Sequence, residues 1–313
     1  MLDTINKALA AVDYPTQPVG LYEPISYVLD MGGKRLRPTL LLMAYSLYKN
    51  DFETAMPAAI GIETYHNHTL LHDDLMDNAD MRRGRATVHK KWNDNTAILS
   101  GDTMLIMAFR HFMNCQNERT PEVLELFART AQEICEGQQY DVNFETRTDV
   151  TEAEYIEMIR LKTSVLLACA AKAGALLAGA PNEDAEMLYR FAEKVGLAFQ
   201  LQDDYLDVYG DPAVFGKKIG GDILCGKKTF LLINALERAC VRVFVDNEEA
   251  ILEGTFRGSL IDHLPSLLRD AYRRCVDVAQ NHIYRCKEVT NVDLAGYHII
   301  SVSYTHLTLP TIA

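Results

Sequence analysis

A helical hydrophobic period runs through most of this chain and limits what it can fold into. No run of strands and no low-complexity segment precedes residue 240 of the 313, so we expect packed helices rather than a sheet. The segment 168–180 is rich in Ala and Gly, which favours closely packed helices. We therefore predict an all-α, single-domain bundle around a central pocket. The predicted helices span residues 39–48, 55–76, 97–113, 121–140, 151–180 and 183–209.

Two aspartate clusters of the pattern DDxxD occupy residues 73–77 and 203–207, each beside apolar sequence that favours a helix. Residues four apart in a helix lie one turn apart on one face, so Asp73 accompanies Asp77 and Asp203 accompanies Asp207. Like charges at that spacing repel, and a helix gains no stability from this arrangement. A hard cation reverses the sign, and Mg²⁺ held by carboxylates and substrate phosphates suits such a site.

Basic residues follow each cluster in Gly-containing segments that we expect to be loops. One cluster alone would favour a solvated acidic face, with the cations as its salt-bridge partners. Two clusters, each followed by cations beyond the reach of i,i+4 pairing, favour a site for metal ions and a phosphate-rich ligand. The cations are Arg82, Arg83 and Arg85 after the first cluster, and Lys217, Lys218, Lys227 and Lys228 after the second.

Six motifs in a fixed order carry a resemblance to a known family. From about residue 32 to about residue 238, the chain resembles the trans-polyprenyl diphosphate synthases, the family of the farnesyl and geranylgeranyl diphosphate synthases. The resemblance implies an α-helical bundle whose two aspartate motifs face each other across a deep pocket. The motifs are GGKRLRP at 32–38, HDDLMD at 72–77, RRG at 82–84, KT at 162–163, FQLQDDYLD at 199–207 and GGD at 220–222.

The resemblance also implies a reaction. Isopentenyl diphosphate would condense head-to-tail with an allylic diphosphate, giving a short-chain trans-polyprenyl diphosphate and releasing diphosphate. Several Mg²⁺ ions would offset the charge developing on the leaving group, so no Ser, Cys or His nucleophile is needed. The protein would position the substrates and exclude water, which would quench the carbocation.

The resemblance assigns roles residue by residue. The first-choice metal ligands are Asp73, Asp77 and Asp203, followed by Asp207 and Asp74, and the catalytic set adds Lys162 and Arg82 to the first three. Isopentenyl diphosphate would be bound by Lys34, Arg37, His66 and Arg83. The allylic diphosphate would be bound by Arg82, Lys162, Thr163, Gln200, Lys217 and Lys227.

Some of these residues also have ordinary structural explanations. His66 lies seven positions before Asp73, so it projects to nearly the same helical face, where a packed His is as common as a ligand. Gln200 fits an ordinary buried amide equally well. The run Lys34, Arg35 and Arg37 also fits a solvated segment, and Arg35 is the member most expected to be only that. Trp92, the only Trp, has no assignment from sequence.

Residues just before the first cluster bear on product length. Thr69 lies one turn before Asp73 and Tyr65 two turns before it, so both are expected to face the pocket. The resemblance places His68 where short-chain enzymes often carry an aromatic stop. Because Tyr65 and His68 are bulky, we expect farnesyl or, more strongly, geranylgeranyl diphosphate rather than a long quinone side chain. The first cluster also lacks a two-residue insertion found in many bacterial farnesyl synthases, which favours the same product.

Composition excludes several other classes. The net charge of -12 and pI of about 5.2 disfavour binding to nucleic acid or an anionic membrane. No apolar run reaches the ~20 residues of a transmembrane helix, and the N-terminus lacks the pattern of a secretory signal. Seven cysteines without CxxC spacing indicate reduced thiols in a cytoplasm. We further expect a homodimer.

The C-terminal quarter departs from the pattern. We predict a helical domain over 1–239 and an atypical segment over 240–313, where the helical period is lost at VRVFVD (241–246) and GTFRGS (254–259). The final residues 301–313 resemble translated adapter or vector sequence, and we expect them to be unstructured. A frameshift or gene-assembly artefact after about residue 239 explains this better than a divergent natural extension.

Two other functions fit part of the sequence. A class I terpene cyclase would share the fold and one aspartate cluster, but the complete second DDxxD and the basic set of Lys34, Arg37 and Arg83 argue against it. A non-catalytic partner subunit of a prenyl synthase would be expected to have lost aspartates or basic residues. None of these is missing here.

Overall fold

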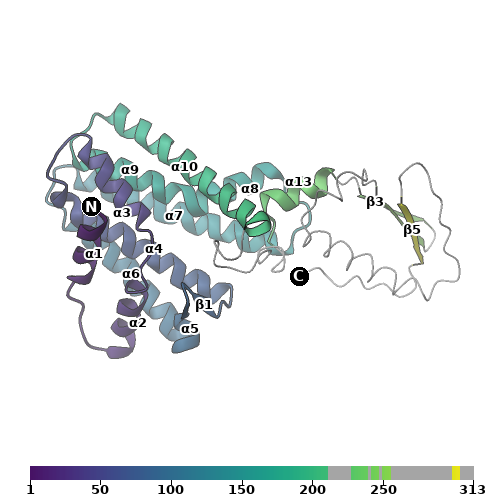
Figure 1. The fold of residues 1–313 in the computed structure, drawn as a ribbon, viewed down its shortest axis with the longest axis horizontal. Helices are drawn as coiled ribbons and strands as arrows, with labels where there is room; N and C mark the ends of the chain where they lie inside the picture. The colour runs from purple at the N-terminus through teal and green to yellow at the C-terminus, as the bar shows by residue number, and fades with distance from the viewer. Residues whose placement is uncertain (211–226, 239–240, 247–248, 255–297, 304–313) are drawn as a thin grey trace. The chain divides into compact units, whose positions relative to one another are not determined.

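The computed structural model describes residues 1–210, 227–238, 241–246, 249–254 and 298–303. Helices make up most of this part of the chain (Figure 1), so the all-α prediction is confirmed. The chain divides into two compact units, one of Met1–Glu136 with Arg160–Leu197 and one of Gly137–Ile159 with Ala198–Ala313. The α-helices are α1 (Leu2–Ala10), α2 (Val19–Leu29), α3 (Leu36–Ser46), α4 (Met56–Met76), α5 (Val88–Lys91), α6 (Asp94–Met113), α7 (Thr120–Thr146), α8 (Glu152–Ile159), α9 (Val165–Leu177), α10 (Asn182–Tyr209) and α13 (Phe230–Arg238).

The first unit is organised around α4, which packs most extensively against α6. Phe112 of α6 stacks on Phe127 of α7 with ring centroids 4.4 Å apart, and Tyr65 of α4 meets Phe127 edge-on at 5.1 Å. All three rings are buried. Burial of each such side chain contributes roughly 1.5–3 kcal/mol, so this aromatic cluster fixes the position of the helix that carries the first aspartate motif.

Close packing between α3 and α9 confirms the expectation drawn from the Ala- and Gly-rich segment. A Cβ atom on Gly174 would lie 2.0 Å from the carbonyl oxygen of Leu41, so no larger residue fits there. The backbones of α3 and α9 are therefore in direct contact. This contact fixes the position of α3, the helix that follows the loop containing Gly32 and Gly33.

All six predicted helices are present, with ends that differ by up to six residues. The predicted helix 151–180 is divided into α8, a π-helical turn η2 (Arg160–Ser164) and α9. The sequence missed α1, α2, α5 and α13, because α2 contains Pro24 and the other three are short. A short 3₁₀ turn η1 (Phe52–Ala55) leads into α4.

In the second unit, α13 packs against α8, and the Asn234 side chain donates to Glu152 at 3.2 Å. The loss of helical period after residue 240 corresponds to strands β3 (Val241–Asp246) and β4 (Glu249–Gly254), which pair antiparallel. Strand β5 (His298–Ser303) pairs antiparallel with β4. Ser301–Ser303 thus end a strand where the sequence predicted an unstructured tail, and 304–313 lie outside the described residues.

Among the described helices, none combines the length and apolar character needed to cross a bilayer.

Candidate active site

The loop between α2 and α3 has an unusual backbone. Gly32, Gly33 and Arg35 all have positive φ, at 76°, 142° and 49°. Glycine adopts this region at no steric cost, whereas Arg35 does so only when its surroundings hold it there. The loop therefore turns tightly, and Lys34 is presented on the surface between these residues.

A two-strand hairpin contains Arg82 and Arg83 and contacts the loop between α2 and α3. Strands β1 (Met81–Arg82) and β2 (Arg85–Ala86) are joined by Arg83 and Gly84, whose φ values of 51° and 76° suit a tight hairpin turn. Arg83 donates to the carbonyl oxygen of Gly32. A Cβ atom on Gly33 would lie 2.9 Å from Arg83 Nη2, so glycine is required for this close approach.

Arg37 and His66 meet next to this contact. Arg37 Nη1 lies 3.1 Å from His66 Nε2, and because Arg only donates, Nε2 is the acceptor and Nδ1 carries the proton. Burial, followed by the charges of Arg37 and other arginines, holds the pKa of His66 well below its usual range. Arg37 Nε is buried without a hydrogen-bond partner in the described structure. An orphaned guanidinium donor of this kind suits a bound anion.

Four residues assigned to isopentenyl diphosphate therefore lie on three segments of the first unit. We call Lys34, Arg37, His66 and Arg83 the basic cradle. The structure brings Arg37 to His66 and Arg83 to the loop that carries Lys34. Burial lowers the pKa of Arg37 to about 10, although the Glu63 carboxylate opposes this. Arg37 nevertheless remains charged at neutral pH.

The prediction for Arg35 as a solvated residue was wrong. Its side chain is buried and Nη1 lies 2.6 Å from Glu63 Oε1 on α4. A charged group leaves water at high cost unless it is paired and hydrogen-bonded, and Glu63 provides that pairing. The pattern of Lys34, Arg35 and Arg37 gave no sign of this, because the partner lies 28 positions away.

The first aspartate motif ends α4 in a defined way. Asn78, with φ of 49°, follows the C-cap Asp77, and its N–H donates to the Leu75 carbonyl at 3.2 Å. The N–H of Ala79 donates to the Asp74 carbonyl at 2.9 Å, which completes a Schellman motif. The motif therefore lies in the last helical turn, where the helix dipole is negative and carboxylates are unfavourable without a cation.

Asp74, a second-choice metal ligand, is committed to another contact. It is 5% exposed and accepts from Arg82, with both Nε and Nη2 at 2.7 Å from Oδ1. Burial raises the pKa of Asp74, and Arg82 opposes this. Asp73 is half-buried and Asp77 exposed, so these two members of the motif reach solvent.

The second motif lies in the last two turns of α10, in the second unit. Asp204 is 2% exposed and accepts from the Tyr155 hydroxyl of α8 and from Gln200 Nε2 at 3.2 Å. Asp207 is also buried, and Asp203 is half-buried. Gln200, expected near the allylic substrate, thus supports its own helix from one turn away. The last turns of α4 and α10 contain no basic residue.

Lys162 and Thr163 lie in the π-helical turn between α8 and α9. A Cβ atom on Gly196 of α10 would lie 2.6 Å from Ser164 Cα, so α10 passes directly against this turn. Such turns often occur at functional sites because they present side chains out of helical register. Lys227 precedes α13, and Lys217 lies outside the described residues.

The donor chemistry of the two motifs fits Mg²⁺. Among the described residues, no three His, Cys, Asp or Glu side chains are grouped to hold a metal ion by themselves. Mg²⁺ commonly binds one or two carboxylates and completes its shell with water and substrate phosphates. Solvent-reaching carboxylates at Asp73, Asp77 and Asp203 are suitable donors for that arrangement.

The three residues linked to product length lie on α4 before the first motif. Tyr65 is buried and its hydroxyl donates to the Ala131 carbonyl at 3.3 Å. His68 Nδ1 donates to the Gly101 carbonyl at 2.9 Å, and burial, followed by the charge of His72, lowers the pKa of His68 to about 4. Thr69 is half-buried and its hydroxyl donates to the His66 carbonyl at 2.8 Å.

Sequence reasoning missed supporting residues that act through long-range contacts. Tyr155 and Glu63 belong to no recognisable motif. Trp92 now has a role, since it meets Tyr27 edge-on at 5.2 Å while Lys91 lies over both rings. The Tyr27 hydroxyl donates to the Ala86 carbonyl at 2.9 Å, so this aromatic cluster anchors the arginine hairpin.

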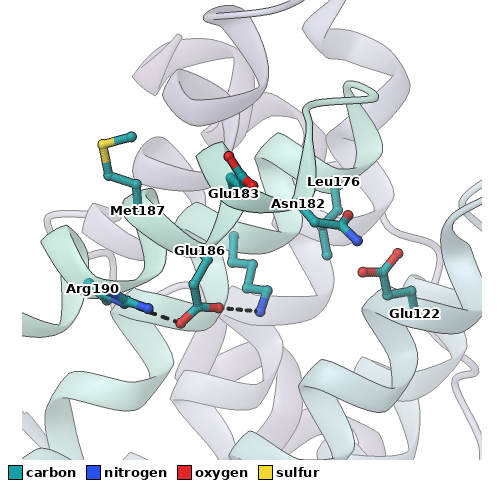
Figure 2. A pocket seen from close by; sticks show the side chains of 8 residues that line it. Glu122, Leu176, Asn182, Glu183, Glu186, Met187 and Arg190 are labelled. Atoms are coloured by element: carbon teal, nitrogen blue, oxygen red, sulfur yellow. Dashed lines mark hydrogen bonds and ion pairs between the residues drawn. The ribbon is translucent and has the colours of Figure 1, made fainter.

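A groove of about 610 Å³ lies elsewhere in the first unit, between α9 and α10 (Figure 2). Lys172 bonds Glu186 at 2.8 Å on its wall, and Arg190 adds a second contact to Glu186 at 3.5 Å. It contains none of the residues predicted from the motifs. Its lining residues are Glu122, Lys172, Leu176, Asn182, Glu183, Glu186, Met187 and Arg190.

Known proteins match this chain over most of its length. The family model described as polyprenyl synthetase matches residues 18–250. The geranylgeranyl diphosphate synthase of Methanosarcina mazei is 45% identical over 242 residues, which are 77% of this chain and 75% of that protein. A geranylfarnesyl diphosphate synthase of Natronomonas pharaonis is 39% identical over 254 residues, which are 75% of this chain and 74% of that protein.

A solved structure agrees with these relatives. The crystal structure of a geranylgeranyl pyrophosphate synthase is 52% identical to this chain and superimposes with a TM-score of 0.71. The match covers 75% of this chain and 71% of that protein.

Proposed function

This chain belongs to the polyprenyl synthetase family and is a short-chain prenyltransferase, and we propose that it uses Mg²⁺ to make geranylgeranyl diphosphate. The reaction joins isopentenyl diphosphate head-to-tail to an allylic diphosphate and releases diphosphate. The observation that carries the proposal is the meeting of Arg37 with His66, and of Arg83 with the Gly32 loop, in a unit that also contains Asp73 and Asp77.

The basic cradle binds the diphosphate of isopentenyl diphosphate. Arg37 retains one buried donor, Nε, without a hydrogen-bond partner in the described structure, and Lys34 and Arg83 lie at the surface. Charge-assisted hydrogen bonds to phosphate are about twice as strong as neutral ones. The cradle has no carboxylate among its own four members, so it attracts a diphosphate without a metal ion.

The aspartate motifs bind the allylic diphosphate through Mg²⁺, held by Asp73, Asp77 and Asp203, with Asp207 and Asp74 in weaker or indirect roles. When bound, Mg²⁺ neutralises charge on the oxygens of the leaving diphosphate. Asp74 keeps Arg82 beside the motif, so Arg82 can reach a ligand there only from this fixed position. Lys162, Thr163, Gln200, Lys217 and Lys227 complete the allylic site.

The length of the product depends on the residues before the first motif. Tyr65 and His68 are large and both are held by hydrogen bonds to backbone carbonyls, so neither moves aside easily. Thr69 is smaller. Relatives include makers of geranylgeranyl and of the longer geranylfarnesyl product, and the bulk at Tyr65 and His68 favours the shorter one here. The enzyme would act in the cytoplasm as a homodimer.

Product analysis tests the proposal. The protein is incubated with labelled isopentenyl diphosphate and, in turn, with each allylic primer of one to four isoprene units. We expect geranylgeranyl diphosphate to accumulate with Mg²⁺ and no product with EDTA. Products well beyond geranylgeranyl would refute the length assignment, and condensation that persists in EDTA would refute the metal role.

A further inference from the structure

We infer that Arg35 and Glu63 form a buried positioning pair that sets the shape of the basic cradle. The inference rests on the proposed function, because it concerns the site assigned to isopentenyl diphosphate. The side chains of Arg35 and Glu63 are only 4% and 2% exposed, so the pair acts through its neighbours rather than on a ligand.

The backbone of the loop needs an anchor. Three of its four residues from Gly32 to Arg35 have positive φ, and Arg35 is the non-glycine member among them. Such a conformation persists only where the surrounding contacts overdetermine it. Arg35 is also the N-cap residue of α3, and no side chain caps the helix there. The loop would otherwise be free to relax.

The Arg35 side chain supplies that anchor by joining three helices. Its Nη1 pairs with Glu63 on α4 at 2.6 Å, its Nη2 donates to the Leu29 carbonyl at the end of α2 at 2.9 Å, and its Nε donates to Asn6 of α1 at 3.3 Å. Glu63 Oε1 also accepts from Asn67 at 3.2 Å. The planar guanidinium can make all these contacts at once, which a lysine cannot.

Two members of the basic cradle, Arg37 and His66, are close in sequence to the members of the ion pair. Arg37 follows Arg35 by two residues, and His66 follows Glu63 by three, on the same face of α4. Arg37 and His66 then meet at 3.1 Å. The ion pair therefore fixes the distance between α3 and α4 at the place where the two ligand-binding side chains touch.

Glu63 also offsets repulsion among the arginines around it. Arg35, Arg37 and Arg83 are gathered near one buried carboxylate, Glu63, whose charge acts favourably on both Arg37 and Arg83. Three guanidiniums repel one another in a site of low dielectric constant. Glu63 offsets part of this repulsion, and the cluster keeps the positive excess that attracts a diphosphate.

The test is a double substitution, Arg35→Met with Glu63→Gln. Removing one partner of a buried pair leaves an unpaired charge and is strongly destabilising, whereas replacing both is often neutral. The matched control is Lys172→Met with Glu186→Gln, which removes the ion pair in the groove of Figure 2. Arg35→Lys is a third variant, which keeps the charge but not the three-way contact.

Isopentenyl diphosphate binding is measured by calorimetry in EDTA, so that the aspartate motifs do not contribute. We expect the Arg35–Glu63 double variant to bind at least about tenfold more weakly, because small displacements of a positioning group have large effects. Its melting temperature should stay within about 4 °C of the parent protein. The control should bind like the parent protein, and Arg35→Lys should lie between them.

In steady-state assays the same double variant should raise the KM for isopentenyl diphosphate by the same factor. The KM for the allylic substrate and kcat should change less than about threefold, since those depend on the other motif residues. Unchanged binding in the double variant would overturn the positioning role, even in a fully active enzyme. If the parent protein binds isopentenyl diphosphate but forms no product, and the double variant binds it more weakly, the positioning role is supported and the proposed reaction is refuted. A parent protein that binds no isopentenyl diphosphate would refute both.

Discussion

The two DDxxD motifs share a sequence pattern but differ in what surrounds the second aspartate of each. Asp74 of the first motif is held by the cation of Arg82, from the hairpin that follows in the chain. Asp204 of the second motif is held by the phenol of Tyr155, from α8, and by the amide of Gln200. Among the contacts described, a cation therefore supports the second aspartate in the first unit, and a phenol and an amide donate to it in the second.

This difference shows that a motif does not decide which of its carboxylates can meet a ligand. In the first motif Asp73 and Asp77 reach solvent, and in the second only Asp203 is more than marginally exposed, since Asp204 and Asp207 are buried. Each arrangement uses one aspartate as a fixed support within the helix. The ligand roles of the others stay a proposal, which the following substitutions test.

The largest expected effect follows removal of a proposed metal ligand from either motif. Asp73→Ala and Asp203→Ala should each lower kcat about a thousandfold, which corresponds to about 4 kcal/mol of transition-state stabilisation. Single-turnover assays at saturating Mg²⁺ measure the loss. Asp80→Ala is the matched control, because this exposed carboxylate lies just beyond the first motif and pairs with Lys90. Near-normal turnover in a well-folded Asp73→Ala protein would exclude the metal role.

The contacts of Arg82 to Asp74 and of Tyr155 to Asp204 should contribute differently to the free energy of unfolding. Arg82→Met leaves Asp74 buried without its cation and should reduce the free energy of unfolding by about 3 kcal/mol. Tyr155→Phe removes one hydrogen bond to a carboxylate and should cost about 2 kcal/mol. Urea unfolding at pH 8 measures both values. The Arg82→Met loss should shrink at pH 5, because Asp74 can then take up a proton and become neutral.

Arg82→Lys keeps the charge and serves as the control for this pair of variants. If Tyr155→Phe proves the more damaging change, then the distinction between charged and neutral support is wrong.

Part of the loss of folding stability at acidic pH should come from α4, the helix that carries the first motif. Because the folded pKa of His68 is about 4 and its ordinary value is 6.5, the unfolded chain binds the proton more tightly. The contribution of His68 to the free energy of unfolding is therefore fully present above its ordinary pKa of 6.5. It is lost as the pH falls towards the folded pKa of about 4. Between pH 6.5 and pH 5 the loss from His68 should be about 2 kcal/mol. Helix α10 contains no His, so the second motif lacks this contribution.

Urea unfolding at both pH values, with His68→Gln beside the parent protein, measures the His68 share. The lowered pKa of His66 adds a loss in the same direction, so the variant should retain some acid sensitivity. An equal loss in parent and variant would show that His68 is not responsible.

The smallest effect is on product length alone. His68→Ala, or Tyr65→Ala with it, should lengthen the product by at least one isoprene unit, because both side chains occupy space before the first motif. Val195→Ala provides a control, since Val195 stands eight residues before Asp203 as Tyr65 stands eight residues before Asp73. Chromatography of the dephosphorylated products distinguishes the lengths. An unchanged product from both α4 variants would place the chain-length determinant elsewhere.

The sequence by itself determined the helical class, the approximate positions of six helical segments and the resemblance to the family. Helical period is a local property, and motif order is a property of the chain alone, so neither requires knowledge of neighbours in space. The resemblance also supplied the candidate residues, from Lys34 to Lys227. It placed Asp73, Asp77 and Asp203 ahead of Asp74 and Asp207 as ligands, and burial separates the residues in the same way.

Only the tertiary structure decided which charged residues are supports. Arg35 and Glu63 are 28 positions apart, and Tyr155 and Asp204 are 49 apart, so no periodic pattern links them. The cost of burying a charge depends on whether a partner arrives from another element of the fold. That is why Arg35, which resembles a solvated residue in sequence, lies at the centre of a buried contact between three helices.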